Sequence, residues 1–166
     1  MSDETQSIPR VSPEITEAQK EAFFKTFLAD QLYQETFELL GGNFVIVIRS
    51  ISMEENADIL KQIAYDRVAN RISPNDDYYL SRVSHYRLGI SLVSINDKPF
   101  AEEITRETKP GDSKTGTSYV SERADLLAKW PMVKLAAVQT KMGELDQRVL
   151  SLLDSVSNRD FWKAGA

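Results

Sequence analysis

The strongest structural signal in this chain is a run of regularly spaced apolar residues near the C-terminus. Intervals of three and four residues separate its members, which are Leu135, Val138, Met142, Leu145, Val149 and Leu152. Such spacing places side chains along one narrow face of an α-helix. We therefore expect a long helix that begins at Met132, after Pro131 interrupts a preceding helix from about Ser121. This face of the helix, the 135–152 seam, belongs either to the chain's own core or to an interface with another helix.

A second regular stripe predicts a helix across residues 78–93. Its members also recur at intervals of four and three residues, and they are Tyr79, Val83, Tyr86, Ile90 and Val93. We expect these side chains to be buried, whereas Arg82, His85 and Arg87 lie off the stripe and should face solvent or a partner. The following segment, 94–100, has the turn residues and the proline that are typical of a short extended turn.

The N-terminal part of the chain contains signals for a helix, a strand and a second helix. Ser12-Pro13 can start a helix and Gly41-Gly42 can end one, so we expect a helix over residues 12–40. Its apolar residues surround the helix axis, which indicates burial on several sides, by the core or by a partner chain. The β-branched segment 43–52 predicts a strand, and a capping box at Ser52 and Glu55 predicts a helix over residues 53–71.

Together these elements predict a mainly α fold, a single-domain helical bundle with a short β-strand or hairpin element. With 166 residues, the chain is long enough for one domain with a substantial core. Residues 1–12 are expected to form a flexible N-terminal arm, and residues 13–166 the domain. The polar segment 101–118 has few apolar residues, so we expect a mobile surface loop there.

Composition argues against several classes of protein. The net charge is −5 and no basic patch is evident, whereas a nucleic-acid binder needs clustered cations. The chain has no cysteine, so disulfides and thiolate metal sites are excluded. The N-terminal segment is polar and acidic, unlike a signal peptide, and the longest apolar run, residues 44–48, is too short to cross a membrane. We therefore expect a cytosolic protein that binds neither nucleic acid nor membrane.

Residues with catalytic potential are sparse. His85 is the only histidine, and the chain has neither a Gly-x-Ser-x-Gly elbow nor a phosphate-binding glycine loop. One histidine cannot form a His-x-x-x-His metal site, and a helix N-terminus explains the acids at residues 75–77. The adjacent acids Glu54-Glu55 are expected to be solvated. We therefore predict a non-enzymatic protein with no catalytic residue, no cofactor and no metal.

Several elements between residues 44 and 162 occur in a recognisable order. A short apolar strand is followed by "SMEEN" at a helix start, "YYLSRVSHYRLGISLVSINDKPF", a Trp-Pro break, and a long helix with "NRDFW" near its end. This order resembles that of tail assembly chaperones and baseplate-hub assembly proteins of tailed bacteriophages. "SLVSINDKPF" is similar to the I-x-S-I-(N/D)-G-x turn of such proteins, although Asp97 stands where that turn usually has glycine. Residues 1–40 are outside the pattern, which points toward a structural role in the virion instead of a transient chaperone.

The resemblance implies a non-enzymatic protein of the phage tail, in the baseplate hub or neck or as a tail assembly chaperone. It implies contacts with other tail or virion proteins, such as the tape-measure protein, or self-association, in the host cytoplasm during assembly or in the virion. We expect helix-mediated contacts through Phe23, Phe24, Phe27, Leu135, Val138, Met142, Leu145, Val149, Phe161 and Trp162. The alternative is a cellular helical adaptor or regulatory protein that binds its partner through the 101–118 loop.

Overall fold

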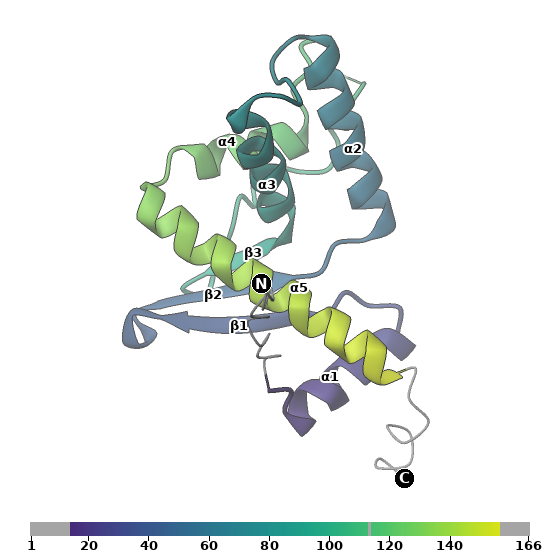
Figure 1. Cartoon of the computed structure of the whole chain (residues 1–166), viewed down its shortest axis with the longest axis vertical. Helices are drawn as coiled ribbons and strands as arrows, with labels where there is room; N and C mark the ends of the chain where they lie inside the picture. Colours follow the sequence, from purple (N-terminus) through teal and green to yellow (C-terminus); the bar gives the residue numbers. More distant parts are fainter. Residues whose placement is uncertain (1–13, 113, 157–166) are drawn as a thin grey trace, which may run out of the picture.

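The structure, a computed structural model, describes residues 14–112 and 114–156 of the chain (Figure 1). Within these residues it contains five α-helices, a short 3-10 helix and four strands. In chain order they are α1 (Glu17–Leu28), β1 (Gln34–Leu39), η1 (Leu40–Gly42), β2 (Phe44–Arg49), α2 (Met53–Val68), α3 (Asp77–Ser91), β3 (Leu92–Ile95), β4 (Lys98–Pro99), α4 (Tyr119–Ala128) and α5 (Met132–Val156).

The prediction of one helix over residues 12–40 was wrong, because this segment forms α1 and then β1. Asp30 adopts a left-handed backbone conformation, with φ of 53°, shortly after α1 ends. In β1, Phe37 is buried while Thr36 and Glu38 on either side are exposed, which is the two-residue alternation of a half-buried strand. The apolar residues of 12–40 surround a helix axis because they combine a helical and a strand pattern.

The strands form an antiparallel sheet in the order β1-β2-β3-β4. β1 and β2 make a hairpin in which Phe37 pairs with Ile46, and the turn between them uses Gly41 and Gly42 at positive φ. The Gly-Gly pair therefore closes a hairpin instead of ending a helix. The predicted short extended turn after residue 93 is the β3–β4 hairpin, with Asn96 and Asp97 both at positive φ.

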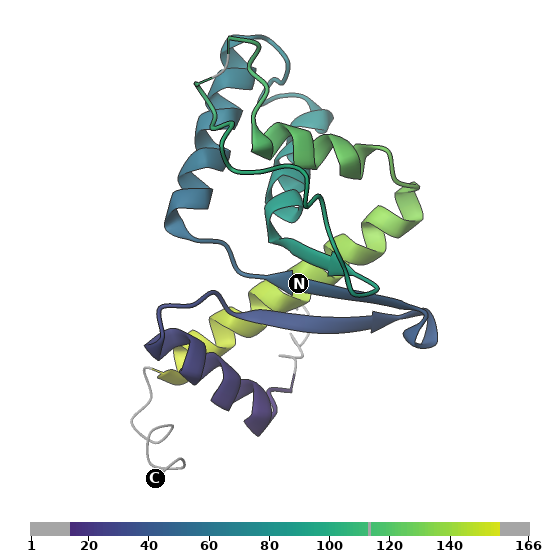
Figure 2. The ribbon, with the colours of Figure 1, turned by 180° about the vertical axis from the view of Figure 1, so that it is seen from behind.

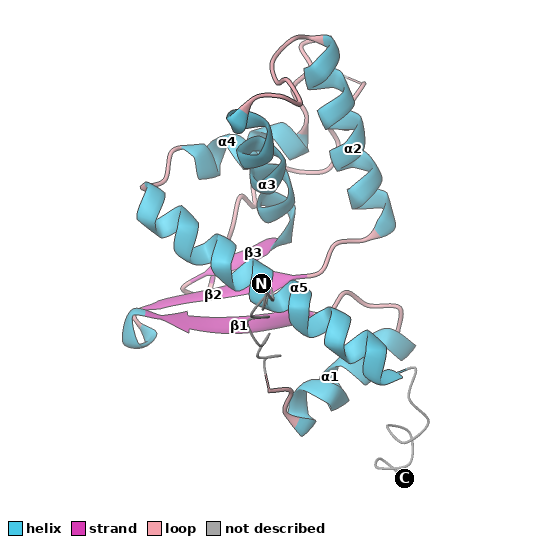
Figure 3. Ribbon diagram, in the orientation of Figure 1, coloured by secondary structure: helices cyan, strands magenta, loops and turns pink. Residues whose placement is uncertain are grey.

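Helix α5 lies across one face of the sheet, in front of β1 and β2 in Figure 1 and behind them in Figure 2. Between helix and sheet is the sheet core, whose most buried members include Ile46, Ile48, Val138 and Leu145. The prediction of a helical bundle is corrected here: helices dominate, but the longest one packs on a sheet, so the fold is mixed (Figure 3). The strands were under-predicted because β1 was assigned to a helix.

Helices α2, α3 and α4 enclose a second core, the helical core, which includes Ile59, Tyr86, Ile90 and Val120. Helices α3 and α4 approach closely at Gly89, where an added Cβ would lie 3.2 Å from the backbone nitrogen of Ala124. Buried polar residues also lie within this part of the molecule, among them Asp58, Gln62 and Asp66. The helical core is therefore held by hydrogen bonds as well as by apolar packing.

Helix boundaries follow several of the sequence signals. The capping box of Ser52 and Glu55 is confirmed at the start of α2, and Pro131 separates α4 from α5 as expected. The N-cap of α3 is Asp76, which accepts a hydrogen bond from the Tyr78 amide, and not Ser73. The described residues of the 101–118 segment form turns without a helix or a strand.

Candidate functional site

The 135–152 seam, which we considered as a contact surface, lies in the sheet core of the chain itself. Val138, Leu145 and Leu152 are at most 1% exposed, and Met142 is 8% exposed. Leu135 and Val149 are partly buried and pack against the same core. The seam side chains are thus covered by the chain's own sheet, so the core interpretation of the heptad spacing is the one that the structure shows.

The aromatic residues predicted on the first helix differ in their surroundings. Phe23 is buried and its ring contacts those of Phe27 and Tyr33, with centroid distances of 6.1 and 5.5 Å. Phe24 is partly buried. Phe27 is 51% exposed and its neighbour Leu28 is 65% exposed, so the end of α1 presents apolar surface to solvent. The predicted contact residues Phe161 and Trp162 lie outside the described residues.

The C-terminal half of α5 also carries exposed apolar side chains. Leu150 is 63% exposed and Leu153 is 41% exposed, although Leu152 between them is fully buried. The ends of α1 and α5 lie side by side in both Figure 1 and Figure 2. We call the exposed residues Phe27, Leu28, Leu150 and Leu153 the apolar end of the molecule.

His85 is buried, which corrects the expectation that it faces solvent or a partner. Helix α3 is covered on two sides, because α2 and α4 pack on one side and Gln139 of α5 donates a hydrogen bond to Ser84 on another. Among the described residues, Nδ1 of His85 has no hydrogen-bond partner. Burial lowers the pKa of His85, and the nearby charge of Arg82 lowers it further. Both effects favour the neutral form of this imidazole.

The two arginines that flank His85 also have partners within the chain. Arg82 donates hydrogen bonds to the Tyr86 hydroxyl at 3.1 Å and to Asp125 at 2.7 Å, and its side chain is mostly buried. Arg87 is 45% exposed and pairs with Asp146 of α5 at 2.6 Å. Arg82 thus departs from the expectation of a solvent-facing side chain, while Arg87 agrees with it.

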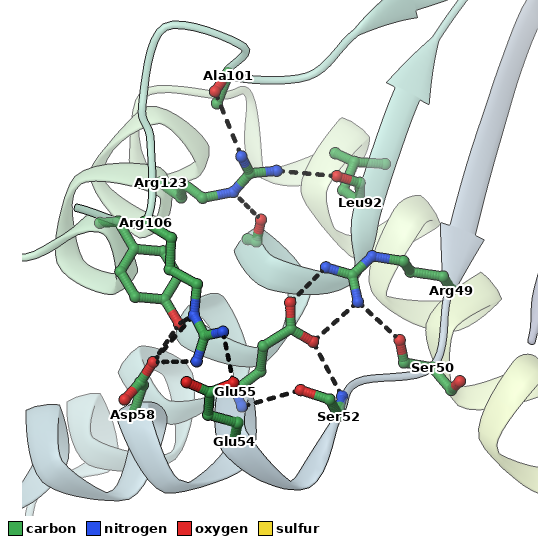
Figure 4. Close-up of polar contacts among 12 residues, drawn as sticks. Arg49, Ser50, Ser52, Glu54, Glu55, Asp58, Leu92, Ala101, Arg106 and Arg123 are labelled. Atoms are coloured by element: carbon green, nitrogen blue, oxygen red, sulfur yellow. Dashed lines mark hydrogen bonds and ion pairs between the residues drawn. The ribbon is translucent and has the colours of Figure 1, made fainter. Parts of the chain in front are cut away.

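A cluster of arginines and carboxylates lies where β2, α2, α4 and the segment after β4 meet (Figure 4). Arg49, at the end of β2, donates two hydrogen bonds to Glu55, at 2.7 and 2.9 Å. Burial would raise the pKa of Glu55, but the hydrogen bonds from Arg49 and from the Ser52 amide more than offset it, so that the pKa lies below its ordinary value. The expectation that this acid is solvated was therefore wrong.

Arg106 connects the 101–118 segment to α2. Its guanidinium pairs with Glu54 at 2.9 Å and with the buried Asp58 at 2.8 Å, and Asp58 also accepts a hydrogen bond from the Tyr119 hydroxyl at 2.7 Å. Although burial opposes it, these hydrogen bonds keep the pKa of Asp58 below its ordinary value. The predicted surface loop is thus anchored at Arg106.

Arg123 of α4 is held by main-chain carbonyl groups. It donates hydrogen bonds to the oxygens of Gly89 at 2.6 Å, Leu92 at 3.1 Å and Ala101 at 3.3 Å. Two of these carbonyls lie at the C-terminal end of α3, where the helix dipole favours a cation. Burial lowers the pKa of Arg123, and the charge of Arg49 adds to this effect.

The three arginines line one cavity of about 310 Å³, whose wall also includes Glu55 and several apolar side chains. Sequence reasoning did not identify this cavity because Arg49, Arg106 and Arg123 come from segments far apart in the chain. The only local signal was the capping box that places Glu55 at the start of α2. The geometry supports the binding of a small polar group, because three guanidinium side chains line one space.

The described residues contain no group of three or more acidic or histidine side chains placed to hold a metal ion. None of their helices is long and apolar enough to cross a membrane. Comparison of the chain with models of protein families, with curated proteins and with solved structures found no match.

Proposed function

We propose that this protein is a non-enzymatic structural or assembly protein of a tailed-bacteriophage tail, which binds other tail proteins in the host cytoplasm during assembly or in the virion. The observation that carries the proposal is the apolar end, where four large apolar side chains are between 41% and 65% exposed. A single exposed apolar residue is common on a folded protein, but here two neighbouring helix ends carry two such residues each, and we infer that they contribute to a contact surface. The resemblance in sequence supplies the class of partner.

The partner that we propose for the apolar end is an apolar helical segment of the tape-measure protein. Such a segment would pack its apolar face against exposed residues of the apolar end. Removing apolar surface from water contributes roughly 25 cal/mol per Å², so a small patch can hold a partner reversibly. The underlying residues Phe23 and Leu152 are buried and would keep the surface in place.

The test is capture of the tagged protein from its native source during expression, with the bound proteins identified by mass. The double variant Phe27→Ser and Leu150→Ser removes two exposed side chains of the apolar end without entering the core. The matched control, Met53→Ser and Leu60→Ser, changes two side chains of α2 that are 84% and 58% exposed. We expect wild type and control to retain tape-measure, hub or other tail proteins, and the first variant to lose them.

Other outcomes would change the assignment. Recovery of a cellular protein whose binding depends on the 101–118 segment would favour the adaptor alternative. Recovery of only the protein itself, as an oligomer that the double variant disrupts, would assign the apolar end to self-association. A monomer with no bound protein in every sample would overturn the proposal.

A further inference from the structure

We propose that the cavity lined by Arg49, Arg106 and Arg123 binds a small carboxylate that carries a short apolar or aromatic body. This inference concerns a different part of the molecule from the apolar end and does not rest on the proposed function. It follows from the charges on the cavity wall, the hydrogen-bond donors that remain available, and the apolar side chains beside them.

Guanidinium groups outnumber carboxylates on the wall of the cavity. Three guanidinium groups line the cavity, and Glu55 is the one carboxylate among its lining residues. Glu54 and Asp58, which pair with Arg106, are not part of the wall. Among the described residues no carboxylate forms an ion pair with Arg123; three carbonyl dipoles and the charges of Glu55 and Glu103 act on its guanidinium. This partly buried cation has no paired carboxylate, so an anion in this space would stabilise the site.

Arg123 has more hydrogen-bond donors than it uses within the chain. An arginine has five N–H groups, and Arg123 uses three of them on the carbonyls of Gly89, Leu92 and Ala101. One N–H on each terminal nitrogen therefore remains as a donor that a carboxylate oxygen could accept. The ring of Phe100 lies beneath the guanidinium, 5.3 Å from Cζ to the ring centroid, and helps to fix its plane.

The residues of the cavity wall favour a singly charged anion with an apolar body. Glu55 lies in the same wall and would repel a second negative charge, which favours a monoanion over a doubly charged phosphate. Apolar side chains, including Ile90 and Phe100, make up much of the remaining wall. A volume of about 310 Å³ is at the small end of the range for ligand pockets. These features fit one carboxylate attached to a short apolar or aromatic group.

The experiment is a titration of the full-length protein, followed by amide chemical shifts and by calorimetry, with benzoate and its neutral counterpart benzamide. We expect saturable binding of benzoate, with shifts around the cavity, and binding of benzamide at least about tenfold weaker. Inorganic phosphate is the third probe and is expected to bind more weakly than benzoate. Equal binding of benzamide, tighter binding of phosphate, or no saturable binding of benzoate would overturn the proposal.

Variants test whether the arginines are responsible. Arg123→Gln is expected to weaken benzoate binding by at least about tenfold. Because Arg123 also holds the end of α3, Val93→Phe provides a second test that fills the cavity from β3 and leaves all three arginines in place. The control is Arg87→Gln, which removes a guanidinium outside the cavity. Unchanged benzoate binding in either cavity variant would contradict the assignment.

A carboxylate of this kind can come from a free acid or from the end of a peptide. Acetyl-glycyl-phenylalanine and its C-terminal amide distinguish the two sources. If the peptide acid binds at least as tightly as benzoate and its amide does not, the natural ligand is a chain terminus. If only benzoate binds, the ligand is a small free acid, and both results support the carboxylate site.

Discussion

The sheet core and the helical core of this protein are stabilised in different ways. In the sheet core, β-strand residues such as Ile46 and Ile48 meet the apolar seam of α5, and the ion pair of Glu35 with Arg148 is a polar contact between β1 and α5. In the helical core, the Tyr86 hydroxyl donates a hydrogen bond to the buried Asp66, and Gln62 donates another to the same carboxylate. The first core depends on burial of apolar area, and the second also depends on the satisfaction of buried polar groups.

This difference explains which buried residues could be predicted from the sequence. Apolar packing leaves a periodic pattern, because the buried residues recur with the period of the helix or strand. A buried polar residue such as Gln62 or Asp58 looks the same in sequence as one on a solvated face. The sequence pattern therefore predicts the apolar residues of the helical core but not its buried polar residues. Two substitutions and one change of pH test how far the two cores differ.

The largest expected effect is that of a charge in the sheet core. Leu145 is 1% exposed, so Leu145→Asp would bury a carboxylate among apolar side chains and is expected to cost more than about 4 kcal/mol in the free energy of unfolding. Circular dichroism and urea unfolding would show loss of the cooperative transition. Leu150→Asp, on the same helix at 63% exposure, is the control and should change stability by about 0.5 kcal/mol or less. If Leu145→Asp kept most of its helical signal and failed only in assembly, the seam would be an interface.

A smaller effect is expected at the close approach of α3 and α4 in the helical core. In Gly89→Ala the new Cβ would lie 3.2 Å from the nitrogen of Ala124 and 3.3 Å from the carbonyl carbon of Arg123, so the two helices must separate. We expect a loss of about 1–3 kcal/mol in the free energy of unfolding. Gly143→Ala is the matched control in α5, because nothing lies within 4 Å of its added Cβ. That variant should gain up to about 1 kcal/mol from helix propensity.

The two glycine variants are compared with wild type by urea unfolding. The free energy of unfolding should fall with urea concentration at the same slope in all three proteins, so that a change of midpoint reports a change of stability. Stabilisation of the same size by both would mean that α3 and α4 can separate without loss. The helical core would then be less tightly packed than its structure indicates.

The smallest effect is a dependence of stability on pH that arises from His85, a buried residue of α3. The folded state holds the pKa of His85 below 6.5, whereas the unfolded chain has the ordinary value. As pH falls below about 6.5, the unfolded state therefore binds a proton that the folded state does not, and the free energy of unfolding decreases until the folded pKa is reached. For one proton the slope is at most about 1.4 kcal/mol per pH unit.

Urea unfolding between about pH 7.5 and pH 5 measures this slope, and His85→Gln is its control. The variant should lose the dependence in this range, because it has no imidazole to protonate. A separate decrease at more acidic pH is expected in both proteins, since Glu55 and Asp58 have lowered pKa values in the folded state. An equal slope near pH 6 in wild type and variant would show that His85 is not the titrating group.

The sequence alone determined those features that follow from local chemistry and regular spacing. These include α5 with its apolar seam, the capping box that starts α2, the stripe of α3 as far as Ile90, and the break at Pro131, whereas Val93, the last member of the predicted stripe, lies in β3. Each depends on residues within one or two helical turns of each other, so the pattern is present before the chain folds. The partial exposure of Phe27 on α1, in contrast, could not be deduced from a segment whose apolar residues cover every side of a helix.

The tertiary structure alone decided which segments distant in the chain contact one another. β1 became a strand because β2 offers it a hydrogen-bonding partner, and His85 is buried on a helix that α2, α4 and α5 together cover. The cavity exists only because three arginines, at positions 49, 106 and 123, are brought together by the fold. Hydrogen bonds, burial and charge balance between residues distant in the chain leave no fixed spacing in the sequence, and they depend on the packing of the whole molecule.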